Sequence, residues 1–312
     1  MDARITKDRL SNLLSYDWLK ILGAVLAAVL VLSVLFTSLA TRPTLAQSYE
    51  IFGYTDLSYG SDYAELGDRL ENKKAFSYDI LTVTVESFGT SSYGSTVYAA
   101  RRMAGQGDAM FISDYEVYGT NEETGEEELT KASELKTFIE AYSESVLDTQ
   151  VFLSDAANYL DGFFGGDWET GELDEEAVAK AFTARNDSDK RFKTEASKLA
   201  GIEQEKERVL KLRDDLKAVN DALARGVISH TVIEGAGTDG ADKACAFRVG
   251  GAQMRGLTDL FYYEADKDGT TVRSSETLSL MLFDNGNASG DLVYDTLSFL
   301  HYLLDTYEGT QA

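Results

Sequence analysis

The sequence predicts an α/β domain that follows one membrane-spanning helix near the N-terminus. Two observations support this prediction. Residues 21–41 contain no charged side chain, and residues 49–114 alternate between strand-like and helix-like patterns. A strand–helix–strand–helix–strand order is typical of parallel strands joined by right-handed crossovers. The remainder of the chain adds a long helical segment and further strands.

The apolar segment 21–41 has the length of a membrane anchor. Twenty-one helical residues rise about 31 Å, close to the bilayer core of about 30 Å. Residues 1–20 carry four basic side chains, whereas a single one, Arg42, occurs between the segment and Arg69. The positive-inside rule therefore predicts a single-pass protein of the cell membrane, with 1–20 as a cytoplasmic tail and the C-terminal domain outside.

A cleaved signal peptide is the alternative for this segment. The triplets Ser38-Leu39-Ala40 and Thr44-Leu45-Ala46 both have the small residues that cleavage requires. The apolar run is longer than the usual 7–15 residues of a signal peptide, however, which favours an uncleaved signal anchor. Residues 42–48, with the only proline of the chain at Pro43, are then a linker to an extracellular domain at 49–312.

The charge and the rare residue types exclude several classes of site. With 29 Lys and Arg against 53 Asp and Glu, the formal net charge is −24, which disfavours nucleic acid as a partner. The lone Cys245 allows no intrachain disulfide and no cysteine-based zinc site. His230 and His301 are far apart in the sequence, and each is interpreted as a packing or surface residue. No metal and no cofactor is expected.

The first part of the domain has the clearest pattern. Strands are predicted at 49–56, 78–88 and 108–114, and helices at 61–75 and 91–107. Segment 78–88 alternates its side chains most regularly, and the helix at 91–107 has glycine near its end, a common C-terminal signal.

The middle of the chain changes character. Residues 119–130 are interpreted as an acidic loop, and residues from about 132 to 226 as a helical insertion in the domain. In the insertion, apolar residues recur every three or four positions at Val209, Leu212, Leu216, Val219 and Leu223. Ile202 extends this run backwards, but Lys198 and Glu205 interrupt the extension. This run indicates a helical hairpin packed on the domain rather than a coiled coil.

The last third returns to strands. Short strands are predicted within 227–250, a hairpin that turns at Asp268-Gly269, a buried strand at 276–286 and a closing helix at 291–307. The acidic run from Glu264 has Ser275 where a calcium loop needs a carboxylate, and the glycines at 235–242 have no phosphate-loop spacing. With no nucleophile, base or metal motif, no enzymatic activity is expected.

Two stretches resemble the extracellular solute-binding proteins of ABC importers. The order of "YEIFGYTD", "YDILTVTVESF" and "AARRMAGQGDAMFISD" is similar to the first lobe of that family, and "SETLSLMLFDNG" with "LVYDTLSFLHYLL" is similar to its late strand and helix. The whole chain also resembles uncharacterised membrane proteins of Gram-positive anaerobes. Two features depart from the solute-binding family: an anchor replaces its lipid-modified cysteine, and the helical insertion replaces much of its second lobe.

The resemblance implies a periplasmic-binding-protein-like domain that captures a small polar solute and has a membrane transporter subunit as its partner. In such α/β sheets, ligands bind beyond the carboxyl ends of the strands. The candidate ligand-binding residues at these ends, and two aromatic residues that offer stacking faces, are Thr55, Asp56, Tyr59, Ser87, Ser91, Ser92, Tyr93, Asp114, Tyr115 and Trp168. The alternative function is that of a non-catalytic interaction subunit, in which a degenerate binding fold docks a membrane partner.

Overall fold

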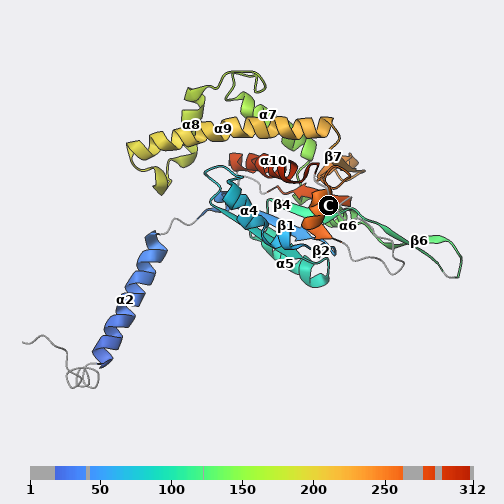
Figure 1. Ribbon diagram of the computed structural model, residues 1–312, viewed down its shortest axis with the longest axis horizontal. Helices are drawn as coiled ribbons and strands as arrows, with labels where there is room; N and C mark the ends of the chain where they lie inside the picture. Colours follow the sequence, from blue (N-terminus) through green and yellow to red (C-terminus); the bar gives the residue numbers. More distant parts are fainter. Residues whose placement is uncertain (1–17, 40–42, 122, 263–276, 285–289, 310–312) are drawn as a thin grey trace, which may run out of the picture. The chain divides into compact units, whose positions relative to one another are not determined.

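The computed structural model describes residues 18–39, 43–121, 123–262, 277–284 and 290–309 (Figure 1). The chain divides into two compact units, Met1–Arg42 and Pro43–Ala312.

The first unit contains one apolar helix, α2 (Trp18–Leu39). Its 22 residues rise about 33 Å, enough to cross a bilayer core. The window Trp18–Leu35 has a mean hydropathy of 2.4, and none of it is buried within the protein. The helix is therefore consistent with a membrane anchor or a signal peptide, and it begins three residues before the predicted start at Ile21.

A mixed six-stranded sheet forms the centre of the second unit, in the order β3-β1-β4-β10-β8-β7. β1 pairs in parallel with β3 and β4, which confirms the parallel arrangement predicted from residues 49–114. β10 is antiparallel to both β4 and β8, and β7 is antiparallel to β8. The six strands are β1 (Ser48–Tyr54), β3 (Thr82–Phe88), β4 (Ala109–Ser113), β7 (Ser229–Ile233), β8 (Lys243–Arg248) and β10 (Leu278–Leu282).

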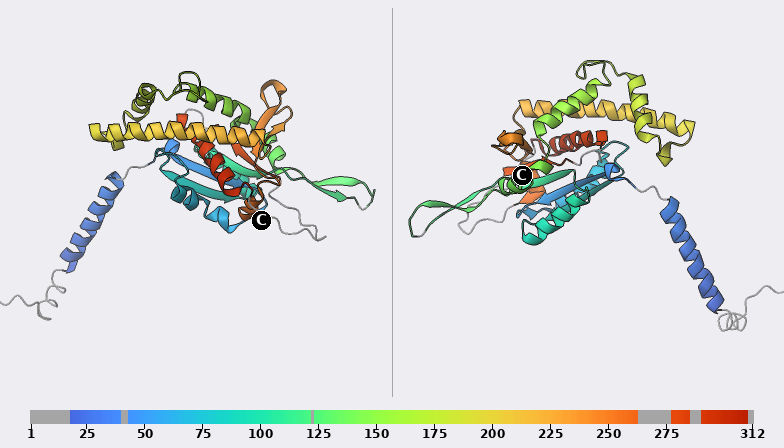
Figure 2. Two further views of the ribbon diagram at one scale, coloured as in Figure 1. Left: turned by 45° about the horizontal axis from the view of Figure 1, so that its top comes forward. Right: turned by 180° about the vertical axis from the view of Figure 1, so that it is seen from behind.

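Helices cover both faces of this sheet (Figures 1 and 2). Because side chains alternate along a strand, Ile51 and Phe111 enter one core and Phe52 and Met110 enter the other. The first core takes side chains from α4 (Leu66–Lys73), α7 (Thr149–Asp161), α8 (Glu175–Asn186), α9 (Glu195–Ala224) and α10 (Thr296–Tyr307). The second takes them from α5 (Ser92–Met103) and α6 (Glu134–Tyr142).

Short elements complete the unit. The small strands β2 (Ser58–Tyr59) and β9 (Phe261–Tyr262) pair with each other. The short helices are α3 (Ser61–Ala64), η1 (Leu45–Gln47), η2 (Ser143–Ser145), η3 (Lys190–Phe192), η4 (Thr238–Gly240), η5 (Arg255–Asp259) and η8 (Gly290–Asp295). The predicted turn at Asp268-Gly269 lies outside the described residues.

The predicted helical insertion is helical along most of its length, and α9 is its longest element. Thr194 begins α9 by accepting a hydrogen bond from the Ser197 amide, as capping threonines commonly do. The apolar seam of this helix is buried and packs with α7, α8 and α10, in agreement with helices packed on the domain rather than a coiled coil.

The prediction of a structureless acidic loop at 119–130 is wrong. This segment belongs to an antiparallel hairpin of β5 (Val117–Thr120) and β6 (Glu127–Lys131), which projects from the domain in both views of Figure 2. The turn forms because the Asn121 side chain accepts from the Glu123 and Thr124 amides, and Gly125 adopts a positive φ of 72°. The many glutamates concealed this short hairpin pattern.

Candidate functional site

The predicted ligand-binding residues lie mostly at the carboxyl ends of β1, β3 and β4, where Asp56 and Asp114 are paired with neighbouring residues. The Asp56 carboxylate accepts from the amide and the hydroxyl of Thr90, at 3.1 and 2.5 Å. The Asp56 amide donates to Glu134 at 2.9 Å, and the Lys131 ammonium lies 3.2 Å from Glu134 and 3.6 Å from Asp56. Asp114 accepts from Ser133 at 2.7 Å.

Tyr59, which was predicted to offer a stacking face, uses its hydroxyl to connect two strands. The Tyr59 hydroxyl lies 2.8 Å from the Gly53 carbonyl and 2.9 Å from the Phe88 carbonyl, so it links the ends of β1 and β3. Burial raises the pKa of this hydroxyl. The Thr55 hydroxyl similarly accepts from the Leu57 amide.

The remaining predicted residues are dispersed. Ser87 lies within β3, Ser91 caps α5, Ser92 begins α5, and Tyr93 is 79% exposed. Tyr115 is half-buried after β4, and Trp168 lies in the loop between α7 and α8, where its amide donates to Asp161. The two cavities along α9 and the smaller one beside Gly250 have none of the ten in their linings. Ligand binding at the strand ends stays a prediction.

Two cavities in the described part of the chain lie along α9 instead. They have volumes of about 560 and 1130 Å³ and share the lining residues Lys74, Glu207 and Lys211, and together we name them the α9 groove. The smaller cavity is bounded by α9, the end of α4 and the segment that leads into β3. The larger is bounded by α4, α9 and α10.

Two lysines at the end of α4 are placed on the groove by a tight helix terminus. Lys74 adopts a left-handed conformation with φ of 51°, and its amide closes the helix on the Leu70 and Glu71 carbonyls. Such a conformation is uncommon for a side chain other than glycine and marks a position worth testing for function. Lys73 and Lys74 are both exposed, and within the described residues neither ammonium has a hydrogen-bonded or ion-paired partner.

A compact polar cluster forms one wall of the larger cavity. The buried Asp215 carboxylate on α9 accepts from Lys211 at 2.8 Å, from Ser298 at 2.5 Å and contacts His301 Nδ1 at 2.6 Å. Burial alone would raise the pKa of Asp215, but the bonds from His301, Lys211 and Ser298 outweigh it and lower the pKa. The same contact raises the pKa of His301, against the opposing effect of burial.

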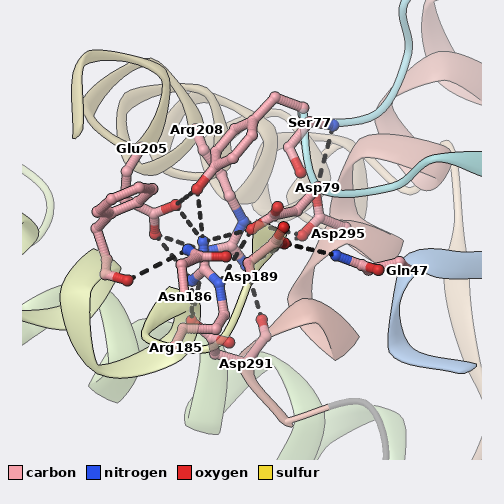
Figure 3. Close-up of polar contacts among 12 residues, drawn as sticks. Gln47, Ser77, Asp79, Arg185, Asn186, Asp189, Glu205, Arg208, Asp291 and Asp295 are labelled. Atoms are coloured by element: carbon pink, nitrogen blue, oxygen red, sulfur yellow. Dashed lines mark hydrogen bonds and ion pairs between the residues drawn. The ribbon is translucent and has the colours of Figure 1, made fainter. Parts of the chain in front are cut away.

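Beside the smaller cavity, three arginines and five carboxylates form a largely buried ion network (Figure 3). Arg185 on α8 donates to Asp79 at 2.7 Å, to Asp291 at 2.6 Å and also to Glu205. Arg191 joins Asp79 to Asp189, at 2.6 and 2.8 Å. These contacts tie α8 and η3 to the segment before β3 and to η8.

Arg208 is the most deeply buried member of this network, with a fully buried guanidinium group. It donates to Glu205 at 3.1 Å, to Asp295 at 3.1 Å and to the Tyr159 hydroxyl at 3.0 Å. Burial would lower the pKa of Arg208, but these anionic neighbours, Asp295 first, raise it. Burial would likewise raise the pKa of Glu205, but Arg208 and Arg185 lower it. Arg208 and Glu205 are therefore both charged at neutral pH.

The ion network and the groove share a boundary, because Tyr78 and Arg208 also line the smaller cavity. The Tyr78 hydroxyl donates to Glu205 at 2.8 Å and accepts from Arg185 at 2.9 Å. The network thus fixes the position of α9, and α9 forms the long side of the groove. The arrangement offers a preformed site for binding and, in the described ranges, no group of three acidic, cysteine or histidine side chains that could hold a metal.

Sequence reasoning missed both the groove and the ion network. The only sequence feature that pointed to the ion network was Glu205, which interrupts the apolar seam of α9. The Glu205 side chain is buried because Arg208 lies one turn away and pairs with it. In a chain with 53 acidic residues, a pairing of this kind does not stand out in the sequence.

Replacing His301 by glutamine is expected to destabilise the domain most between about pH 4 and 6.5, by about 1.5–3 kcal/mol, the usual value for a hydrogen bond to a charged group. The pKa of His301 is higher in the folded than in the unfolded protein, so protonated His301 stabilises the fold. This stabilisation is complete below the unfolded pKa and is lost as the pH rises through the folded pKa. The pKa of Asp215 is lower in the folded protein, so the ionised carboxylate stabilises the fold. This stabilisation is complete above the unfolded pKa and is lost as the pH falls through the folded pKa.

Urea unfolding of the wild type and H301Q at pH 5 and pH 9 measures this difference. His230 is the matched control, because burial lowers its pKa and its contribution is lost as the pH falls. The difference for H230Q therefore follows the opposite trend. An equal destabilisation by H301Q at both pH values contradicts the prediction.

Comparison of the chain with models of protein families, with curated proteins and with solved structures found no match.

Proposed function

We propose that this chain is a membrane-anchored, extracytoplasmic binding protein that captures a zwitterionic solute, such as a short peptide, in the α9 groove. The observation that carries this proposal is the groove itself, whose lining combines unpaired lysines with exposed carboxylates. The role involves binding without a chemical step. It retains the ligand capture implied by the resemblance to solute-binding proteins and a periplasmic-binding-protein-like domain, but it locates the ligand along α9.

The charges around the larger cavity favour a ligand that carries both signs. Lys73 and Lys74 offer two cations at one wall, while Glu207, Asp214 and Asp305 offer carboxylates from α9 and α10. Leu210 and Tyr302 add apolar surface between them. A volume of about 1130 Å³ is at the upper end of small-molecule sites, so a short peptide fits better than a single amino acid.

The proposed placement rests on the charges that flank the apolar helix. Basic residues precede α2 more densely than they follow it, which supports a cytoplasmic N-terminus and an external domain. Capture outside the membrane suits an accessory component of a transport system, and a transporter subunit is the proposed partner.

A tripeptide, trialanine, is expected to raise the melting temperature of residues 43–312 by several degrees. At 100 times its dissociation constant, a ligand adds about 2.7 kcal/mol, and each kcal/mol shifts a domain of this size by about 2–4 °C. The paired substitutions Lys73→Gln and Lys74→Gln should raise the dissociation constant roughly tenfold or more, since each removes a charge-assisted contact.

Two controls make this test specific. The exposed lysines Lys193 and Lys198 lie outside the groove lining, so the paired substitutions K193Q and K198Q remove the same charge without changing the affinity. Trialanine with an acetylated amine and an amidated carboxyl terminus lacks the two end charges and should bind weakly. Equal binding of the blocked and free peptides would argue against recognition of a zwitterion.

The second candidate function is a non-catalytic interaction subunit. The observation that favours it is the pairing of Asp56, Thr90, Lys131 and Glu134 at the strand ends, which occupies groups that a solute would otherwise contact. A folded domain that shows no thermal shift with peptides, amino acids, sugars or divalent cations supports this second function over capture.

A further inference from the structure

The β5–β6 hairpin combines features of a surface that receives another strand. Figures 1 and 2 show it extending away from the six-stranded sheet, and its two strands form a sheet of their own. The described side chains from Tyr118 to Thr130 are exposed or half-exposed. An isolated two-stranded hairpin is only marginally stable in water, and its outer edges present backbone groups that can pair with a further strand.

An apolar pair lies on this hairpin. Tyr118 and Leu129 stand opposite each other in the register, so their side chains share a face, yet they are 55% and 46% exposed. The Tyr118 hydroxyl donates to Glu116 at 2.9 Å, which holds the ring near the base of the hairpin. The pair therefore offers a small apolar contact that nothing in the described part of the chain covers.

The charge of the hairpin selects what can cover it. Residues 117–131 contain five glutamates and one lysine, and that lysine, Lys131, is engaged with Asp56 and Glu134. A second copy of a chain with a net charge of −24 would bring like charges together, and an anionic lipid surface would also be repelled. A cationic segment would instead place its charges opposite Glu126, Glu127 and Glu128.

We propose that the β5–β6 hairpin binds an extended, lysine- or arginine-rich segment of a partner protein, which adds to the hairpin as a further strand and covers Tyr118 and Leu129. Main-chain hydrogen bonds to the free edge provide affinity in this mode of recognition, and alternate side chains provide specificity. The basic side chains of the segment contact Glu128, whose side chain lies on the face opposite Leu129, and its apolar side chains on the other face contact the aromatic–aliphatic pair. This interaction does not depend on the α9 groove.

The test uses the full chain in detergent micelles and a fluorescein-labelled peptide of four Lys-Val repeats, followed by fluorescence anisotropy at 150 mM salt. A peptide of four Lys-Pro repeats has the same charge but cannot donate the hydrogen bonds that a central strand needs at its proline positions. We expect saturable binding of the Lys-Val peptide, at least tenfold tighter than that of the Lys-Pro peptide. Equal binding of the two peptides, or no binding of the Lys-Val peptide, overturns the proposal.

Variants locate the binding surface. The paired substitutions Tyr118→Ser and Leu129→Ser should weaken binding roughly tenfold, and Glu127→Gln with Glu128→Gln should do the same. Glu172→Gln with Glu176→Gln removes the same charge from exposed sites outside the hairpin and should leave the affinity unchanged. If this control weakens binding as much as the hairpin variants do, the peptide binds through the overall negative charge of the protein rather than at the hairpin, and the proposal fails.

Hydrogen exchange supplies a readout that general electrostatic attraction does not change. Strand addition protects backbone amides in Val117–Thr120 or Glu127–Lys131, depending on the edge used, at least tenfold when the Lys-Val peptide is bound. Protection that is absent from both strands, despite saturable binding, overturns the assignment of this edge.

Discussion

Replacing Arg208 by methionine is expected to lower the free energy of unfolding by about 3–5 kcal/mol, the range for removing one partner from a buried ion pair. The guanidinium group is fully buried, and its loss leaves the buried Asp295 carboxylate without its ion-pair partner, while Glu205 keeps only Arg185. For a domain of this size the melting temperature should fall by about ten degrees. Thermal and urea unfolding of the wild type and R208M measure the change.

Two further variants distinguish a lost ion pair from a lost packing contact. Adding Asp295→Leu to Arg208→Met removes the stranded carboxylate, so part of the stability should return, as it does when buried ion pairs are replaced by apolar side chains. Arg225 contacts Asp221 and Glu308 at an exposed site, and Arg225→Met should leave the melting temperature nearly unchanged. A double variant that is less stable than R208M contradicts this account.

The second large effect is expected at Phe111, in the middle of β4. Its side chain is fully buried, and its ring centroid lies 5.1 Å from that of Phe261 and 6.0 Å from that of Phe299. Phe111→Ala removes this aromatic contact and leaves a cavity between the sheet and α10, at a cost of about 3–5 kcal/mol.

Urea unfolding measures the cost at Phe111, and two substitutions serve as comparisons. Phe111→Leu retains much of the volume and should cost clearly less. Tyr93 is also aromatic but 79% exposed, so Tyr93→Ala should have little effect on stability. If F111A and Y93A destabilise to the same extent, the region around β4 is not the core that the burial indicates.

The two predicted positions, Arg208 and Phe111, differ in how far their roles could be predicted from the sequence. The strand that contains Phe111 could be predicted because "AMFIS" is a short apolar run between turn residues, and such local patterns determine buried strands. The parallel pairing of β1, β3 and β4 followed from the order of elements alone. Arg208 could not be singled out, because its partners come from Asp295, Asp291 and Glu205, two of which lie more than 80 residues away.

The same limit applies to the α9 groove. Lys73, Lys211 and His301 reach it from three helices that are distant in sequence, and only the packing of α4, α9 and α10 brings them together. The predicted strand-end residues could be located from topology, because parallel strands end at a common edge. The pairing of Asp56 depends on Lys131 and Glu134, which lie more than 70 residues further along the chain and which no sequence pattern linked to Asp56.

The position of β10 has a consequence for how the protein is made. β10 lies between β4 and β8, yet it begins only at Leu278. A chain that is made from its N-terminus therefore exposes the edges of β4 and β8 that face β10 until Leu278–Leu282 has been made. The six-stranded sheet can close only after that point, and a chain that ends before Leu278 keeps these edges of β4 and β8 open.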